Sequence, residues 1–305
     1  MAFGQIYCTT DFGDASNIQT IPHFPDCSGF SNRKSVFFDG LTPGESISVL
    51  DLPFQFIQVQ GMVIMAWVKF APEMETDTSY DQRCIVDYSE NIFTTADARG
   101  YSIFVRKTTA GNITMNFYYR NNGFNRVNCS AILNLNNYNL SQPMLVVASL
   151  RYESAGNNSI QNLRVYQSGV GAPGDNYVEV TRSNNAAGTR FPVNQDLCFG
   201  NTNNAGQTSQ EFRGNIDEVV IYNGSNIGSS YAQLADSYYG TNNAHNLDVS
   251  TLQFYNQVVG WYRFGDNYFL ESTFLKFPNA SNGSGATATG DSSLTSSKIV
   301  GPIVT

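Results

Sequence analysis

Residues 118–125 combine aromatic rings with side-chain amides in one short segment. Aromatic faces stack on sugar rings, and amides hydrogen-bond to sugar hydroxyls. The segment therefore predicts a glycan-binding loop, with the alternative that its aromatic rings belong to the core or to a protein interface. The predicted group is Tyr118, Tyr119, Asn121, Asn122, Phe124 and Asn125, with Tyr119, Asn121, Asn122 and Phe124 as the principal candidates.

No arrangement of side chains in the sequence predicts catalysis. A glycosidase needs two carboxylates that flank one bond, but Asp217 and Glu218 are adjacent and would point to opposite faces of a strand. His23 and His245 lie in polar segments, and no GxSxG, HExxH or phosphate-binding loop accompanies them. We therefore expect that the protein is not an enzyme.

The charge balance disfavours two classes of partner. Lysine and arginine number 17 against 25 acidic residues, and no basic cluster with interleaved aromatics occurs, so nucleic-acid binding is not expected. No run approaches the roughly 18 apolar residues of a membrane span, and residues 1–8 lack a signal-peptide pattern. We expect no membrane insertion, and a protein of this kind would reach the outside by lysis, by another secretion route or as part of a particle.

The cysteines predict neither a disulfide framework nor a zinc site. They are five in number, widely spaced and without a CxxC pair. Most are expected to be small buried side chains, and Cys8 with Cys27 is the one pair close enough in sequence to suggest a bridge.

Short β-branched and aromatic segments separated by turn residues predict an all-β, two-sheet antiparallel sandwich. Residues 62–70 are apolar on both faces and should form a central strand, whereas residues 113, 115, 117 and 119 should share one buried face. The expected strands are residues 35–38, 46–50, 62–70, 83–88, 101–107, 112–119, 144–152, 162–167, 196–199 and 215–222.

Composition divides the chain into three parts. Residues 1–33 are rich in Gly, Asp, Pro and Ser and predict an irregular N-terminal arm, and residues 34–240 form the sandwich. One short helix is expected at residues 229–239, with Leu234 and Tyr238 facing the sandwich. Residues 241–305 contain few apolar groups and should form a small β extension that packs on the sandwich or on a neighbouring protein.

Three sequence motifs resemble the concanavalin A-like superfamily of laminin-G and pentraxin type. They are an opening SVFFDG at residues 35–40, a central MVIMAWVKF at 62–70 and a closing FRGNIDEVVIY at 212–222, in the order and spacing of that family. The resemblance covers about residues 35–240 and implies a jelly-roll sandwich.

The segments after Tyr222 resemble laminin-G-type structural proteins of tailed, often marine, bacteriophages. They are QLADSYYG at residues 233–240, NLDVS at 246–250 and VGWYRFGD at 259–266, where Tyr262 replaces a second tryptophan of the family motif. The resemblance implies a virion protein that decorates a capsid or forms part of a tail or fibre, with copies of itself, other virion proteins and cell-surface glycans as partners. A secreted or surface lectin outside any virion is the alternative.

The same resemblance implies a structural calcium ion. The family often holds calcium with carboxylates near the first and last strands, which here correspond to Asp39 and Asp217, with Glu218 beside them. The alternative is that Asp39 caps the turn at Gly40 and that Glu218 faces solvent opposite Asp217.

Overall fold

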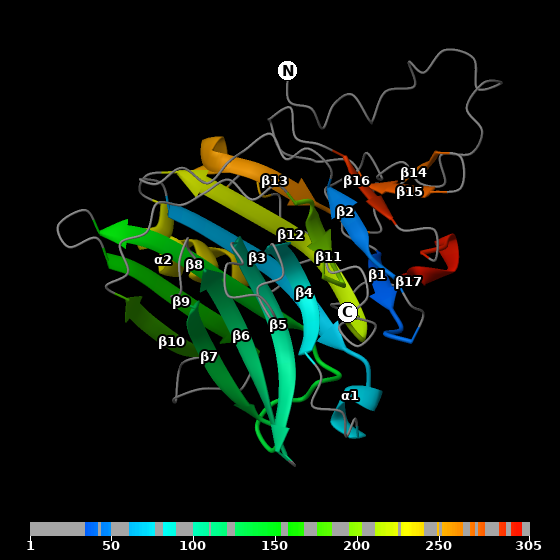
Figure 1. Cartoon of the computed structure of the whole chain (residues 1–305), viewed down its shortest axis with the longest axis horizontal. Coiled ribbons are helices and arrows are strands. Elements are labelled where there is room, and N and C mark those ends of the chain that lie inside the picture. The colour runs from blue at the N-terminus through cyan, green and yellow to red at the C-terminus, as the bar shows by residue number, and fades with distance from the viewer. Residues whose placement is uncertain are drawn as a thin grey trace.

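The structure is a sandwich of two antiparallel β-sheets, shown by a computed structural model in Figure 1. It describes residues 34–41, 44–49, 61–76, 82–89, 100–109, 111–120, 126–153, 158–167, 176–184, 195–202, 211–224, 227–240, 249, 252–264, 269–271, 274–277, 287–290 and 294–300. The predicted all-β, two-sheet architecture is confirmed. The N-terminal arm, and Cys8 with Cys27, lie outside the described residues.

The first sheet has eight strands, of which seven follow the order β10-β9-β8-β3-β12-β1-β17 and β13 pairs with β12 off this path. Every strand pair in it is antiparallel. Its members are β1 (Ser35–Phe38), β3 (Gly61–Phe70), β8 (Met144–Glu153), β9 (Asn158–Tyr166), β10 (Tyr177–Asn184), β12 (Gly214–Gly224), β13 (Val258–Tyr262) and β17 (Ile299–Val300).

The second sheet has nine strands in the order β14-β15-β16-β2-β11-β4-β5-β6-β7. Its members are β2 (Ile47–Val49), β4 (Gln82–Ser89), β5 (Gly100–Thr109), β6 (Asn112–Arg120), β7 (Arg126–Asn134), β11 (Leu197–Phe199), β14 (Phe269–Glu271), β15 (Phe274–Phe277) and β16 (Ala288–Gly290). All ten predicted strands occur, and the prediction missed β7 and β10. Strands β13 to β17 lie in residues 241–305, for which the sequence predicted a small β extension. A four-residue helix, α1 (Glu73–Thr76), follows β3.

Strand β3 lies between β8 and β12 and is buried on both faces, as predicted. Alternate residues of β3, such as Ile64 and Val68, face the core between the sheets, and the others, such as Met65 and Trp67, face a second apolar cluster. Helix α2 (Tyr231–Gly240) covers this second cluster on the side of the sheet away from the sandwich core (Figure 1). Two apolar layers on opposite faces explain the uninterrupted hydrophobic run.

Helix α2 confirms the expected helix and its orientation. Leu234 and Tyr238 are one helical turn apart and are both buried in the second cluster. The described part of the chain has no helix long and apolar enough to cross a membrane.

A β-bulge interrupts β12 between Asp217 and Val220. Glu218 adopts a positive φ of 45°, and the extra residue keeps Val219 in the core between the sheets. The Glu218 carboxylate accepts from Trp261 Nε1 at 2.6 Å and from Arg263 Nε at 2.9 Å. The expectation that Glu218 faces solvent is therefore wrong, because the bulge turns its side chain toward the C-terminal segment, where it is fully buried.

The described strands of residues 241–305 belong to the two sheets. Strand β13 pairs with β12, β16 pairs with β2, and β17 pairs with β1. Just before β17, Lys298 Nζ lies 2.7 Å from Asp39 Oδ2 and 2.8 Å from the fully buried Glu45 Oε1. This ion cluster ties the end of the described chain to the loop between β1 and β2.

We expect Arg263→Met to lower the free energy of unfolding by about 3–5 kcal/mol, because it leaves the Glu218 carboxylate buried without its ion-pair partner. Urea denaturation measures the loss. Adding Glu218→Gln to Arg263→Met should recover part of the lost stability, because the buried charge is removed. The matched control is Arg182→Met at an exposed site on β10, whose free energy of unfolding should stay within about 0.5 kcal/mol of that of the original protein. Equal losses for Arg263→Met and Arg182→Met would contradict a stabilising role for the pair.

We expect Lys298→Met to destabilise the fold by about 2–4 kcal/mol near neutral pH, because two carboxylates lose their shared cation. Burial alone would lower the pKa of Lys298, but hydrogen bonds to Asp39 and Glu45 raise it above its ordinary value. Its contribution is therefore complete below the ordinary lysine pKa of about 10.4 and is lost as pH rises through the raised value.

Burial raises the pKa of Glu45, so its carboxyl group is protonated readily as pH falls. A neutral Glu45 does not need the Lys298 cation, so the stability difference between Lys298→Met and the original protein should decrease at low pH. Thermal unfolding between about pH 4 and pH 11 tests both limits, with Lys69→Met on β3 as the matched control. A stability difference that does not change with pH would refute the assigned role of Lys298.

Candidate functional site

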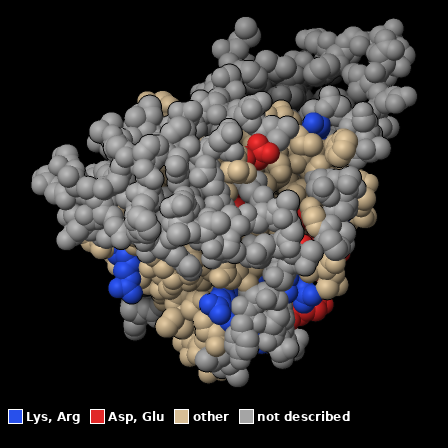
Figure 2. Space-filling view, in the orientation of Figure 1, with Lys and Arg blue, Asp and Glu red and all other residues tan. Residues whose placement is uncertain are grey.

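Charged side chains are few on the described surface of the face shown in Figure 2, where uncharged residues predominate. On the outer face of the eight-stranded sheet, β9, β10 and α2 bring three charged side chains together. Leu163 and Val165 of β9 face the core, so Arg164 and Tyr166 project outward on the alternate positions. In the register of the sheet, Arg164 lies opposite Glu179 and Tyr166 lies opposite Tyr177.

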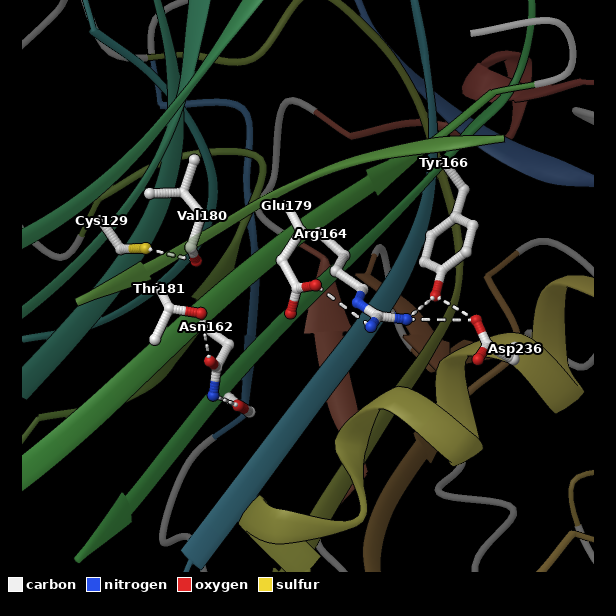
Figure 3. A network of polar contacts seen from close by, with 9 residues as sticks. Cys129, Asn162, Arg164, Tyr166, Glu179, Val180, Thr181 and Asp236 are labelled. Atoms are coloured by element: carbon white, nitrogen blue, oxygen red, sulfur yellow. Dashed lines mark hydrogen bonds and ion pairs between the residues drawn. The ribbon is translucent and has the colours of Figure 1, made fainter. Parts of the chain in front are cut away.

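Arg164 forms the centre of a hydrogen-bonded network (Figure 3). Its Nη2 lies 3.1 Å from Glu179 Oε2, and its Nη1 donates to Asp236 Oδ1 of α2 at 3.1 Å and to Tyr166 Oη at 2.9 Å. Tyr166 Oη in turn donates to the same Asp236 oxygen at 2.8 Å. The network fixes both carboxylates before any ligand arrives.

Aromatic rings surround the Arg164 guanidinium. Its central carbon lies 4.3 Å from the ring centre of Tyr177 and 5.2 Å from that of Tyr231, the first residue of α2. Tyr166 continues the row through contacts with Tyr177 at 5.0 Å and Tyr239 at 4.9 Å between ring centres. Cation–π and ring contacts therefore hold the cation under a half-exposed aromatic surface.

The pKa shifts keep the network in one charge state. Burial alone would lower the pKa of Arg164, but hydrogen bonds to Glu179 and Tyr166 outweigh it and raise the pKa. Burial raises the pKa of Tyr166, and its hydrogen bond to Asp236 raises it further against the opposing effect of Arg164. Arg164 thus stays charged and Tyr166 stays neutral across the physiological range.

Exposure separates the atoms that a ligand can reach from those that support them. The side chain of Asp236 is 59% exposed and that of Glu179 is 28% exposed, whereas that of Arg164 is only 9% exposed. Tyr177, Tyr231 and Tyr239 are half-buried. We call the group Arg164, Tyr177, Glu179, Tyr231 and Asp236 the tyrosine–carboxylate surface.

Two buried donors next to this surface have no hydrogen-bond partner among the described residues. They are Nε of Arg164 and Nε1 of Trp67, and Trp67 stacks on Tyr239 with ring centres 6.0 Å apart. Unsatisfied buried polar groups are rare in folded proteins and recur at sites that bind water or ligands.

An uncharged polar row extends the surface along the same two strands. Thr181 Oγ1 donates to Asn162 Oδ1, and Asn162 Nδ2 donates to Ser149 Oγ, both at 2.9 Å (Figure 3). Asn162 and Ser149 are buried, whereas Thr181 is exposed. The face therefore offers carboxylates, tyrosine rings and the Thr181 hydroxyl side by side, which is a chemistry suited to a sugar.

Most of the predicted glycan-binding loop lies outside the described residues, and the structure places only its two tyrosines. Tyr119 is 5% exposed and lies in the core between the sheets, so its ring presents no face to a ligand. Tyr118 is on the opposite face of β6 and packs edge-on against Phe104 at 4.5 Å, with 7% exposure. Asn121, Asn122 and Phe124 lie outside the described residues.

The structure does not bring the two predicted calcium ligands together. Asp39 follows Phe38, which pairs with Gly214, so Asp39 and Asp217 are separated by four residue steps, or roughly 13 Å, along β12. One calcium ion needs its oxygen ligands at about 2.3–2.6 Å. Within the described ranges, no group of three or more His, Cys, Asp or Glu side chains could hold a metal.

Asp39 and Asp217 instead make local contacts. Asp39 Oδ1 accepts from Leu41 N at 2.7 Å and caps the turn at Gly40, as the alternative interpretation expected. Asp217 is buried and accepts from Glu218 N at 2.8 Å within the bulge. Calcium binding stays a prediction from the sequence resemblance alone.

The sequence prediction missed the tyrosine–carboxylate surface because its residues come from distant segments, with Arg164 and Asp236 72 positions apart. Cys84, Cys129 and Cys198, by contrast, are buried small side chains, as predicted. Cys129 Sγ donates to Val180 O at 3.0 Å and connects the edge strands β7 and β10 of the two sheets (Figure 3).

Comparison with known proteins identifies relatives only at the level of the fold. No family model and no curated protein matches the chain. Among solved structures, a Bacteroides ovatus protein provisionally described as carbohydrate-binding aligns with a TM-score of 0.50 and 12% identity over 90% of this chain. The chain spans 60% of the length of that protein.

Weaker alignments include two further proteins. The enzymatically active domain of tailspike protein 2 of bacteriophage CBA120 aligns with a TM-score of 0.45 and 13% identity, over 83% of this chain and 34% of that domain. The binding domain of botulinum neurotoxin serotype D aligns with a TM-score of 0.36 and 12% identity, over 85% of this chain and 60% of that domain. At these identities, the alignment with the Bacteroides protein shows that this chain has a β-sandwich fold found in a protein of that description.

Proposed function

We propose that this chain is a carbohydrate-binding β-sandwich protein that works as a structural component of a phage particle, without catalysis. The observation that carries the sugar-binding part is the tyrosine–carboxylate surface, where half-exposed rings flank two carboxylates held by one buried arginine. Aromatic faces and fixed hydrogen-bond acceptors are the two elements that sugar recognition requires.

The surface is organised in advance for binding. Glu179 and Asp236 are held by Arg164, so a ligand orders few side chains when it binds. The carboxylate oxygens accept from sugar hydroxyls, and the rings of Tyr177 and Tyr231 offer apolar surface to the carbon–hydrogen side of a sugar. The exposed Thr181, held by the buried Asn162, extends the surface with a hydroxyl group for a second sugar unit.

The particle context is supported by the sequence resemblance to phage structural proteins, with copies of this chain and other virion proteins as partners. The motif at residues 212–222 and the motif at residues 259–266 make one packed unit, because Glu218 of the first contacts Trp261 and Arg263 of the second. This contact gives a physical reason for the two motifs to occur together in one chain.

We expect Tyr231→Ala to weaken binding of the best ligand from a glycan array by about tenfold, because it removes one stacking face. Asp236→Asn should weaken it by a similar factor, because an amide nitrogen replaces a carboxylate acceptor. Isothermal titration measures both, with thermal unfolding to verify the fold.

The matched aromatic control is Phe274→Ala, a change at a 38% exposed ring on β15 of the other sheet, which should leave affinity unchanged. If a glycan binds and neither Tyr231→Ala nor Asp236→Asn weakens it, the sugar site lies elsewhere on the protein.

For the particle, we expect mass spectrometry of purified virions from the biological source to detect this chain, and electron cryo-microscopy to place its sandwich on a capsid or tail lattice in many copies. A chain recovered only free and monomeric would overturn the virion assignment and favour a secreted lectin.

A further inference from the structure

We propose that the tyrosine–carboxylate surface selects sugars that donate hydrogen bonds, amino sugars most strongly and neutral sugars next, and that it discriminates against sugars bearing carboxylate or sulfate groups. This specificity rests on the proposed sugar-binding function and adds the class of ligand to it. It follows from which polar atoms the surface exposes and which it buries.

The cation of the surface cannot meet an anionic ligand. Nη1 of Arg164 is committed to Tyr166 and Asp236, and Nη2 is committed to Glu179. Rings of Tyr177 and Tyr231 lie against the guanidinium, and only 9% of the side chain is exposed. Arginine usually binds carboxylates and sulfates through paired N–H donors, but here Nη1 and Nη2 already donate to protein side chains and Nε is buried.

The charged atoms that remain accessible are carboxylate oxygens. Two carboxylates, Glu179 and Asp236, surround one guanidinium, so the group carries a net charge of +1 − 2 = −1. Helix α2 contributes no lysine or arginine to balance it. Arg151, a further basic residue on this face, is four residues along β8 from Val147, the partner of Arg164, at roughly 13 Å. That separation exceeds the screening length of about 8 Å at physiological ionic strength.

These features rank ligands by their donors and charge. A sugar ammonium group gains a charge-assisted hydrogen bond to Asp236 or Glu179. A neutral sugar hydroxyl gains an ordinary hydrogen bond to the same oxygens. A uronic or sialic acid carboxylate is repelled by the two protein carboxylates at the same distance, and the Nη donors of Arg164 are already engaged by them and by Tyr166. We therefore expect at least about tenfold weaker binding than for its neutral counterpart.

The test begins with a glycan array that contains neutral, amino and acidic sugars, probed with the full chain. For the best-binding glycans, titration then compares matched derivatives that differ at one position: hydroxymethyl, amine or carboxylate. We expect the order amine, neutral, acid, with the amine's advantage declining as salt is raised from about 50 to 500 mM. An acidic sugar that binds as tightly as its neutral counterpart would overturn the specificity while sugar binding stands, whereas no binding to any glycan would overturn both.

A variant separates this surface from the rest of the acidic protein. Asp236→Asn keeps the Glu179 contact to Arg164 and removes one exposed negative charge, so the neutral-to-acid affinity ratio should fall by at least about threefold. Glu73→Gln at an exposed acid of α1 should leave the ratio unchanged. An unchanged ratio in Asp236→Asn, with the fold intact by thermal unfolding, would refute the assignment of selectivity to these carboxylates.

Discussion

The buried contact between Glu218 and Arg263 determines how the eight-stranded sheet is completed. Strand β12 pairs with β3 along one edge, but its other edge is shared by β1 in the first half and by β13 in the second half. The bulge at Asp217 and Glu218 lies where one partner gives way to the other, and it places the Glu218 carboxylate against Trp261 and Arg263. Removing one partner of an ion pair that is almost fully buried is strongly destabilising. The pair therefore stabilises the pairing of β13 with β12.

The same region positions the candidate sugar site. Tyr238 of α2 donates to the Glu218 carbonyl at 3.2 Å, and the apolar face of the helix packs on the side chains of β3, β8 and β12. Once the helix is fixed there, Asp236 reaches Arg164 on β9 and Tyr231 lies over the guanidinium. The site is therefore built on the outer face of the sheet by a helix whose position depends on the bulge, and its residues do not take part in the core between the sheets.

The spacing of apolar residues was sufficient to predict the fold class, the central place of β3 and the packing side of α2. It was insufficient for β10, whose outward residues Tyr177, Glu179 and Thr181 are exposed or half-buried and whose sequence is too polar to be recognised without its partner β9. It also contained a signal against Tyr119 as a sugar platform, because Tyr119 shares the face of Ile113, Met115 and Phe117, all buried in the core. The bulge escaped prediction because one extra residue in a strand leaves no mark in a short pattern.

The carboxylate of Asp39 shows how the chain balances charge at one edge of the sandwich. A cationic side chain lies beside it. Lys298 Nζ is 2.7 Å from Asp39 Oδ2 and 2.8 Å from Glu45 Oε1. Burial raises the pKa of Glu45 because the ionised carboxylate loses its hydration. The positive charge of Lys298 beside it opposes this effect and lowers the cost of keeping the carboxylate ionised. Lys298, just before β17, supplies this positive charge. Because β17 pairs with β1, the same ion pairs also hold β17 against the sheet. Charge balance at this edge is therefore coupled to the pairing of the last described strand.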